Sequence, residues 1–114
     1  MENLKVKLPE ELQSIMNLNN DEWQTLGIDI LDHVMNSVNF MQQQGINDIS
    51  SLTAWRTKKD DTGKFFQIKH RIVIDEKQDI RYELTAFKPM DKNEYRTWCF
   101  EEFGGDPFVN YNLN

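Results

Sequence analysis

The sequence predicts an α+β fold in which a three-stranded antiparallel β-meander packs against one long amphipathic helix and a C-terminal aromatic helix. Three observations predict this fold. Residues 20–45 repeat apolar side chains with the period of a helix, residues 65–87 alternate with a period of two, and a capped aromatic segment follows Pro89. A short helix at the start completes the expected order α-α-β-β-β-α.

The first helix is expected over residues 8–16. Pro9 suits the first helical position because proline has no backbone N–H to leave unbonded there. Glu10 and Glu11 place negative charge near the positive end of the helix dipole. The segment therefore carries the usual signals of a helix start.

The long helix is expected to begin with Asn20 as its cap and to end at Gly45. At about 100° per residue, its apolar side chains cover an arc of roughly 200°. The members of this arc are Trp23, Leu26, Gly27, Ile28, Ile30, Leu31, Val34, Met35, Val38 and Met41. So wide an arc needs more than one neighbouring element to cover it.

Gly27 lies near the centre of this apolar arc. Glycine costs about 1 kcal/mol relative to alanine inside a helix. One interpretation is that another backbone, such as a strand, passes too close for a side chain. The other is that the helix simply tolerates the glycine.

Two strands are expected over residues 65–74 and 80–87, joined by a loop at residues 75–79. Their inward side chains are Phe66, Ile68, His70, Ile72 and Ile74 on the first, and Ile80, Tyr82, Leu84 and Ala86 on the second. In this register Ile74 faces Ile80, and Arg71 faces Glu83 on the other side of the sheet. Apolar residues and opposite charges then pair, which favours this register over a slip by one residue.

The strand that precedes them is expected over residues 51–58. Its register stays open, because either Leu52 and Ala54 or Thr53 and Trp55 would point inward. The turn that follows contains the tripeptide Asp61-Thr62-Gly63, which also occurs in aspartic proteases of the retroviral type. The preceding residues are polar here, however, so we interpret the tripeptide as a hairpin turn in which Gly63 has a positive φ.

The last helix is expected to begin at Asp91, because Asp91 and Glu94 have the spacing of a capping box, and to end at Gly104 and Gly105. Four side chains are expected to share one face: Tyr95, Trp98, Cys99 and Phe103. The whole chain, residues 1–114, is expected to form one domain, with residues 1–8 and 106–114 as flexible ends.

The net charge of −6 is unevenly distributed. Residues 1–50 carry two lysines and eight acidic residues, whereas residues 51–90 carry nine basic and six acidic residues. The helices are therefore acidic and the sheet is basic. The sequence begins without a signal peptide, contains a single cysteine, and has no apolar run long enough to span a membrane, so we expect a cytoplasmic protein with no membrane association.

No residue pattern indicates an enzyme, a metal site or a cofactor. Asp29 and His33 stand four residues apart, near enough to hydrogen-bond, but the sequence offers no further histidine ligand beside them. Acidic neighbours and burial raise the pKa of a thiol, so Cys99 is interpreted as a packing residue. His70 is expected inside the sheet opposite Leu84, which offers it no hydrogen-bond partner.

Nucleic acid is disfavoured as a partner. Lys69, Arg71 and Arg81 share the outward sheet surface, and Trp55 or Phe87 could stack on bases. The overall acidity nevertheless repels phosphate, and Glu83 stands opposite Arg71.

In its general character the chain is similar to immunity proteins, antitoxins and inhibitors from phages or mobile elements, which are also small, acidic and without catalytic residues. This similarity involves no residue-level correspondence. The leading hypothesis is a non-enzymatic protein that binds a protein partner, expected to be basic, in a stoichiometric complex. The residues expected at the interface are Asp29, Asp32, Asn36, Glu101, Glu102, Phe108 and Tyr111.

Two alternatives stay open. The first is a small-ligand domain or a small enzyme whose pocket lies between helix and sheet and involves His70, Tyr82 and Trp98. The second is a homodimer that buries the apolar surface left over by a three-stranded sheet. Elution as a monomer at micromolar concentration would contradict the homodimer.

Overall fold

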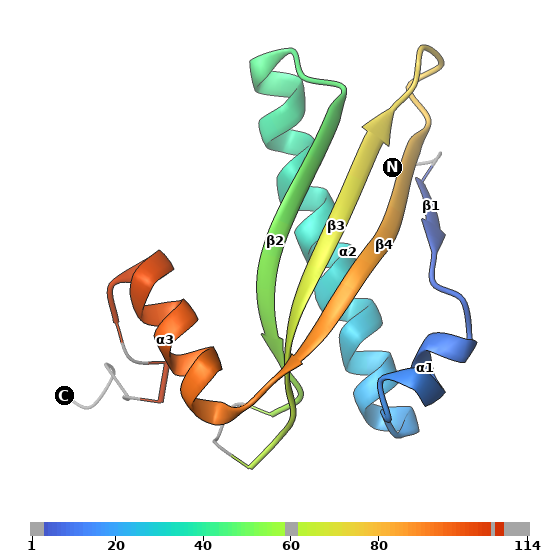
Figure 1. The fold of residues 1–114 in the computed structure, drawn as a ribbon. Coiled ribbons are helices and arrows are strands. Elements are labelled where there is room, and N and C mark those ends of the chain that lie inside the picture. Colours follow the sequence, from blue (N-terminus) through green and yellow to red (C-terminus); the bar gives the residue numbers. More distant parts are fainter. Residues whose placement is uncertain (1–3, 59–61, 106, 109–114) are drawn as a thin grey trace, which may run out of the picture.

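The computed structural model describes residues 4–58, 62–105 and 107–108. Its elements are β1 (Leu4–Lys7), α1 (Glu11–Ile15), α2 (Asn20–Gln44), β2 (Asp48–Arg56), β3 (Phe65–Ile74), β4 (Ile80–Met90) and α3 (Lys92–Phe103). The predicted α+β fold is confirmed, with the helices and the meander in the predicted order (Figure 1). None of the described helices is both long enough and apolar enough to span a membrane.

The sheet contains one strand more than the sequence predicted. Its order is β1-β4-β3-β2, with β2, β3 and β4 antiparallel and β1 parallel to β4. Residues 1–8 were expected to be flexible, but Leu4–Lys7 pairs with residues 80–83. Four residues are too few to show a reliable alternation, and the strand that stabilises them lies far along the chain.

The register between β3 and β4 is the predicted one over its first half. Ile74 pairs with Ile80, and Arg71 pairs with Glu83. Between Lys69 and His70 the register shifts, so that Ile68 pairs with Phe87. This irregularity turns Phe87 toward α2 and leaves Ala86 exposed, so the predicted inward position of Ala86 is wrong.

Strand β2 begins at Asp48, three residues before the predicted start. It adopts the register in which Thr53 and Trp55 point toward α2. Trp55 is buried in the main core, whereas Leu52 is exposed. The alternation of β3 places its inward side chains against the same helix, as predicted.

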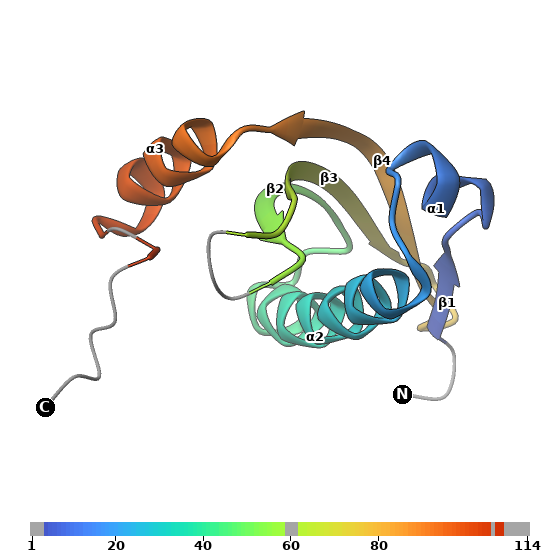
Figure 2. The same ribbon diagram turned by 90° about the horizontal axis from the view of Figure 1, so that it is seen from below.

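The two long helices lie on opposite faces of the sheet (Figure 2). Helix α2 covers one face and forms the main core with β2, β3 and β4. Helix α3 covers the end of the other face, where Tyr95 and Cys99 pack around Phe65. Helix α3 therefore does not lie beside α2, and Phe103, which was expected to share a face with Tyr95 and Cys99, is 76% exposed.

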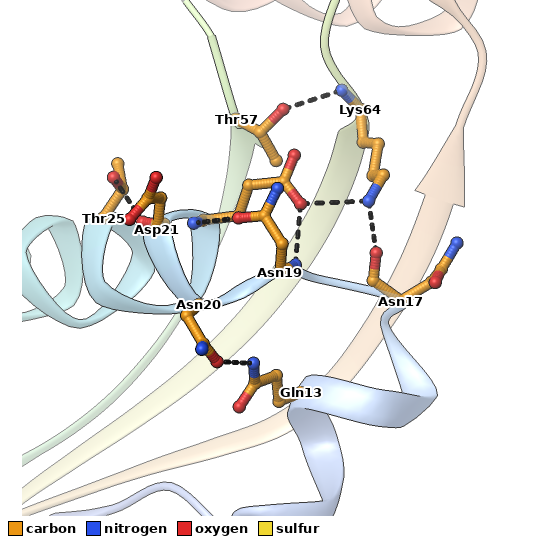
Figure 3. A network of polar contacts seen from close by, with 9 residues as sticks. Gln13, Asn17, Asn19, Asn20, Asp21, Thr25, Thr57 and Lys64 are labelled. Atoms are coloured by element: carbon orange, nitrogen blue, oxygen red, sulfur yellow. Dashed lines mark hydrogen bonds and ion pairs between the residues drawn. The ribbon is translucent and has the colours of Figure 1, made fainter.

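Helix α2 is anchored at its first turn (Figure 3). Its cap is Asn19, one residue before the predicted Asn20. The Asn19 side chain accepts a hydrogen bond from the backbone N–H of Glu22 (2.8 Å), and the Glu22 carboxylate accepts one from the N–H of Asn19 (2.9 Å). Lys64, which follows the β2–β3 turn, donates to the carbonyl of Asn17 and to Glu22 (3.0 Å). This capping box and the lysine fix α2 against the hairpin.

Helix α1 is shorter than the predicted 8–16.

The structure decides between the two interpretations of Gly27 and corrects the one of Gly63. A Cβ built on Gly27 meets nothing within 4 Å, so no backbone crowds this position and the helix simply tolerates the glycine. Gly63 does not have the predicted positive φ. A Cβ there would instead lie 2.5 Å from Oγ1 of Thr57, so glycine is needed for close approach. Residues 59–61, which include Asp61 of the tripeptide, lie outside the described part of the chain.

Candidate functional site

A cluster of polar side chains lies between α2 and the strands it covers. Helix α2 contributes Asp29 and His33, one helical turn apart. The strands contribute Ser51, Thr53 and Trp55 from β2, His70 from β3 and Tyr82 from β4. The alternation of the strands directs all five toward the helix, because every second residue of a strand points to the same face.

His70 is the most buried member, at 2% exposure. Its Nε2 lies 2.7 Å from Oγ1 of Thr53, and its Nδ1 is hydrogen-bonded to the hydroxyl of Tyr82. A neutral imidazole has one donor and one acceptor nitrogen, so both nitrogens are satisfied. The predicted pairing with Leu84 is present, but the expectation that His70 lacks a partner is wrong. Burial and the neighbouring His33 lower the pKa of His70 to about 3.

His33 lies against His70, with 4.3 Å between the two ring centroids. Its Nε2 lies 3.1 Å from Oγ of Ser51. Burial lowers the pKa of His33 below its ordinary value. Both imidazoles are therefore neutral at neutral pH, which avoids two adjacent buried charges.

Asp29 has a different partner from the one the sequence suggested. Its Oδ2 accepts a hydrogen bond from Nε1 of Trp55 at 2.7 Å, rather than bonding to His33. This bond links the exposed edge of α2 to a buried indole and fixes the orientation of the ring.

A cavity of about 180 Å³ lies beside this cluster. It extends from the exposed Asp29 to the buried His70. Its lining consists of Leu26, Asp29, Ile30, His33, Thr53, Ala54, Trp55, Ile68 and His70. The walls are thus mostly apolar, with a carboxylate, a hydroxyl and two imidazoles among them.

The polar side chains of the cluster are hydrogen-bonded to one another. Ser51 and His33 have the contact of a nucleophile with a general base. Ser51 does not line the cavity, however, and Asp29 is bonded to Trp55 instead of orienting His33. Within the described residues, no three or more His, Cys, Asp or Glu side chains are grouped so as to hold a metal ion.

The predicted interface residues fall into two groups that the structure does not bring together. Asp29, Asp32 and Asn36 are exposed on α2, whereas Glu101 and Glu102 are exposed on α3. These helices pack on opposite faces of the sheet. One continuous contact surface cannot include both groups without wrapping around the molecule.

Phe108 is not the exposed aromatic contact residue that was expected. Its ring is half-buried and lies 5.9 Å from that of Phe65. Three cationic groups surround the ring, those of Arg56 at 5.5 Å, Lys92 at 5.4 Å and Arg96 at 5.2 Å. Phe108 therefore belongs to the smaller core under α3.

One further predicted residue lies away from the cavity. Trp98, proposed for a pocket between helix and sheet, packs in the smaller core together with Phe108. Tyr111 lies outside the described residues.

The predicted interface residues did not include an exposed apolar stripe on α2, formed by Ile28, Leu31 and Met35. Their exposed fractions are 62%, 42% and 47%. They stand at positions i, i+3 and i+7, so they form one row on the helix surface. Helical periodicity alone placed them in the buried arc, because it does not tell how much of a wide arc the sheet covers.

The solvent-facing side of α2 is also acidic. Asp21, Asp29 and Asp32 are exposed on this helix, which contains no lysine or arginine. Asp29 and Asp32, three residues apart, form an acidic row. Asp32 stands four residues after Ile28, so this row adjoins the apolar stripe. An exposed apolar row beside an acidic row is an arrangement suited to contact with another molecule.

Comparisons of the chain with protein-family models, curated proteins and solved structures give no match.

Proposed function

We propose that this protein acts without catalysis, by stoichiometric association of the solvent-facing side of α2 with a basic protein partner. The observation that carries the proposal is the exposed stripe of Ile28, Leu31 and Met35 beside the acidic row of the same helix. Single exposed apolar residues are normal on a protein surface, whereas a contiguous group with a polar rim is typical of an interface.

Charge favours a basic partner over a second copy of this chain. Two copies that met through α2 would bring Asp29 and Asp32 of each chain close together, with no lysine or arginine on the helix to offset them. Like charges opposed across an interface disfavour association, whereas a basic surface would be attracted and would associate faster. A homodimer remains an outcome that the experiment distinguishes.

The test begins with affinity capture from the native host, followed by calorimetry with the purified partner. We expect a 1:1 complex. The double variant Asp32→Lys/Asn36→Lys should weaken binding by at least about tenfold, because it replaces one negative charge on this side of α2 by two positive charges. Leu31→Ser/Met35→Ser should weaken it to a similar degree by removing apolar contact area. These side chains are exposed, so the thermal midpoint should change little.

The matched control is Glu101→Lys/Glu102→Lys, which likewise places two lysines on exposed positions, here on α3. It should leave affinity within about twofold of the wild type. Binding that is lost in this control and retained in the α2 variants would place the interface on α3 and contradict the proposal. Light scattering of the isolated protein at micromolar concentration identifies a homodimer. A homodimer that the α2 variants dissociate would also contradict the proposal.

A further inference from the structure

The cavity beside the polar cluster is the size of a side chain. Its volume of about 180 Å³ is below the roughly 300–1,000 Å³ of pockets that hold drug-sized ligands. It does not have the dimensions for a nucleotide or a large cofactor. A short chain of a few heavy atoms with one polar end fits it better.

The polar end of such a group should be positively charged. Among the described residues that line the cavity, Asp29 is the one acidic residue, and none is a lysine or an arginine. Trp55 takes one of its carboxylate oxygens, Oδ2, and the described residues provide no hydrogen bond to the other. That second oxygen can accept a hydrogen bond from a ligand.

The remaining lining residues suit a cation with an apolar stem. The indole of Trp55 attracts cations through its ring face. Neutral His33 and the hydroxyl of Thr53 add hydrogen-bond acceptors without adding positive charge. Leu26, Ile30 and Ile68 form apolar walls for methylene groups. A charged head and a hydrocarbon stem therefore find complementary surfaces in one small cavity.

We propose that the cavity between α2 and β2 binds an alkylammonium group through the Asp29 carboxylate and the Trp55 ring. Two sources share this chemistry, a lysine side chain of a protein partner and a free small alkylamine. The first source rests on the proposed function, because Asp29 belongs to the acidic side of α2 that the partner would cover. The cavity itself can be tested without any partner.

The experiment follows the indole N–H resonance of Trp55 by NMR during titration with n-butylammonium. The resonance is assigned from its loss in Trp55→Phe. We expect a saturable shift with a dissociation constant in the millimolar range, and no comparable shift with n-butanol or butyrate at the same concentration. These two controls have an alkyl stem of similar length with a neutral or a negative head.

Asp29→Asn should weaken n-butylammonium binding by at least about fivefold. An asparagine oxygen can still accept the bond from Trp55, so the urea midpoint of this variant should stay close to that of the wild type. An equal response to n-butanol, an unchanged affinity in Asp29→Asn, or no shift up to about 100 mM ammonium would overturn the proposal. The comparison of the three probes on the wild-type protein keeps the test decisive if Asp29→Asn does not fold.

A second arm separates the two sources. If a partner lysine is the ligand, n-butylammonium competes with the partner and Asp29→Asn weakens the complex. If a free amine is the ligand, n-butylammonium binds while partner affinity stays unchanged. Asp32→Lys/Asn36→Lys lies outside the cavity lining and should retain ammonium binding, so failure of the partner interface and failure of the cavity give different results.

Discussion

At the scale of single residues, His70 shows how a polar side chain is accommodated in the main core. It is buried between α2 and the sheet, yet Thr53 and Tyr82 bond both of its nitrogens. An unsatisfied imidazole in this position would cost roughly 1–3 kcal/mol. Its partners come from the two neighbouring strands. At the sequence level only the cross-strand neighbour Leu84 was considered, which has no polar group, and therefore no partner was expected for His70.

The lowered pKa of His70 predicts that the protein loses stability in mild acid. The pKa is about 3 in the folded protein against an ordinary value of 6.5. Below pH 6.5 the unfolded chain therefore takes up a proton that the folded protein does not, and stability falls as the pH falls toward 3. Between pH 7 and pH 5 we expect a loss of about 2 kcal/mol, measured by urea unfolding.

The control for this prediction is His70→Gln, whose amide also donates and accepts hydrogen bonds but does not titrate. It should be less stable than the wild type at pH 7 and should lose less stability between pH 7 and pH 5. His33, whose pKa is also lowered, accounts for the remaining slope. Equal losses in both proteins would show that His70 is not the group that titrates.

Two glycines predict opposite effects of the same substitution. Gly27→Ala should stabilise the protein by up to about 1 kcal/mol, because a Cβ there meets nothing and alanine is the better helix former. Gly63→Ala should destabilise it, because its Cβ would lie 2.5 Å from Oγ1 of Thr57 and 2.9 Å from the backbone nitrogen of Lys58. Thermal unfolding of both variants tests the pair, and a destabilised Gly27→Ala would contradict the open space described here.

At the scale of the elements, both long helices begin with a capping box. Asn19 and Glu22 form it in α2, and Asp91 and Glu94 form it in α3. Each also ends at a glycine in the left-handed conformation, Gly45 with φ 68° and Gly104 with φ 74°. These signals act between residues a few positions apart, which is why both helix ends were predicted to within one residue.

The cap of α2 can be located by mutation. Asn19→Ala should cost about 1 kcal/mol of stability, because it removes the bond to the N–H of Glu22. Asn20→Ala should cost clearly less, because that side chain only accepts an exposed hydrogen bond from Gln13. Denaturant unfolding compares the two variants, and a larger loss for Asn20→Ala would place the cap where the sequence alone suggested.

At the scale of the whole molecule, the sheet separates two cores of unequal size. The main core under α2 includes residues from three strands, whereas the core under α3 centres on Phe65, Tyr95 and Cys99. Burial raises the pKa of the Tyr95 hydroxyl to about 12. Fewer buried apolar contacts still mean a smaller cost of local opening.

This difference predicts the order in which the backbone opens. In hydrogen exchange, the amides of α3 should exchange several-fold faster than those of α2 and β3, because α3 can detach without disturbing the main core. Cys99→Ala, which removes apolar volume only from the smaller core, should speed exchange in α3 and leave β3 unchanged. Equal protection of α2 and α3 would show that the two cores open as one cooperative unit.

The sequence by itself determined the features that depend on near neighbours along the chain. Helical period, capping residues and the alternation of residues 65–74 identified the helices, the three strands of the meander and the fold class. The register of Arg71 with Glu83 followed from matching two adjacent strands across a short loop. These features are local because their hydrogen bonds and side-chain contacts join residues close in sequence.

Only the tertiary structure decided which surfaces meet. It placed α3 on the face opposite α2, paired β1 with β4, left Ile28 exposed, and gathered Asp29 and His70 at one cavity. The physical reason is that a local pattern specifies which side of an element is apolar but not which neighbour covers it, or how completely. Packing between residues distant in the sequence makes that choice.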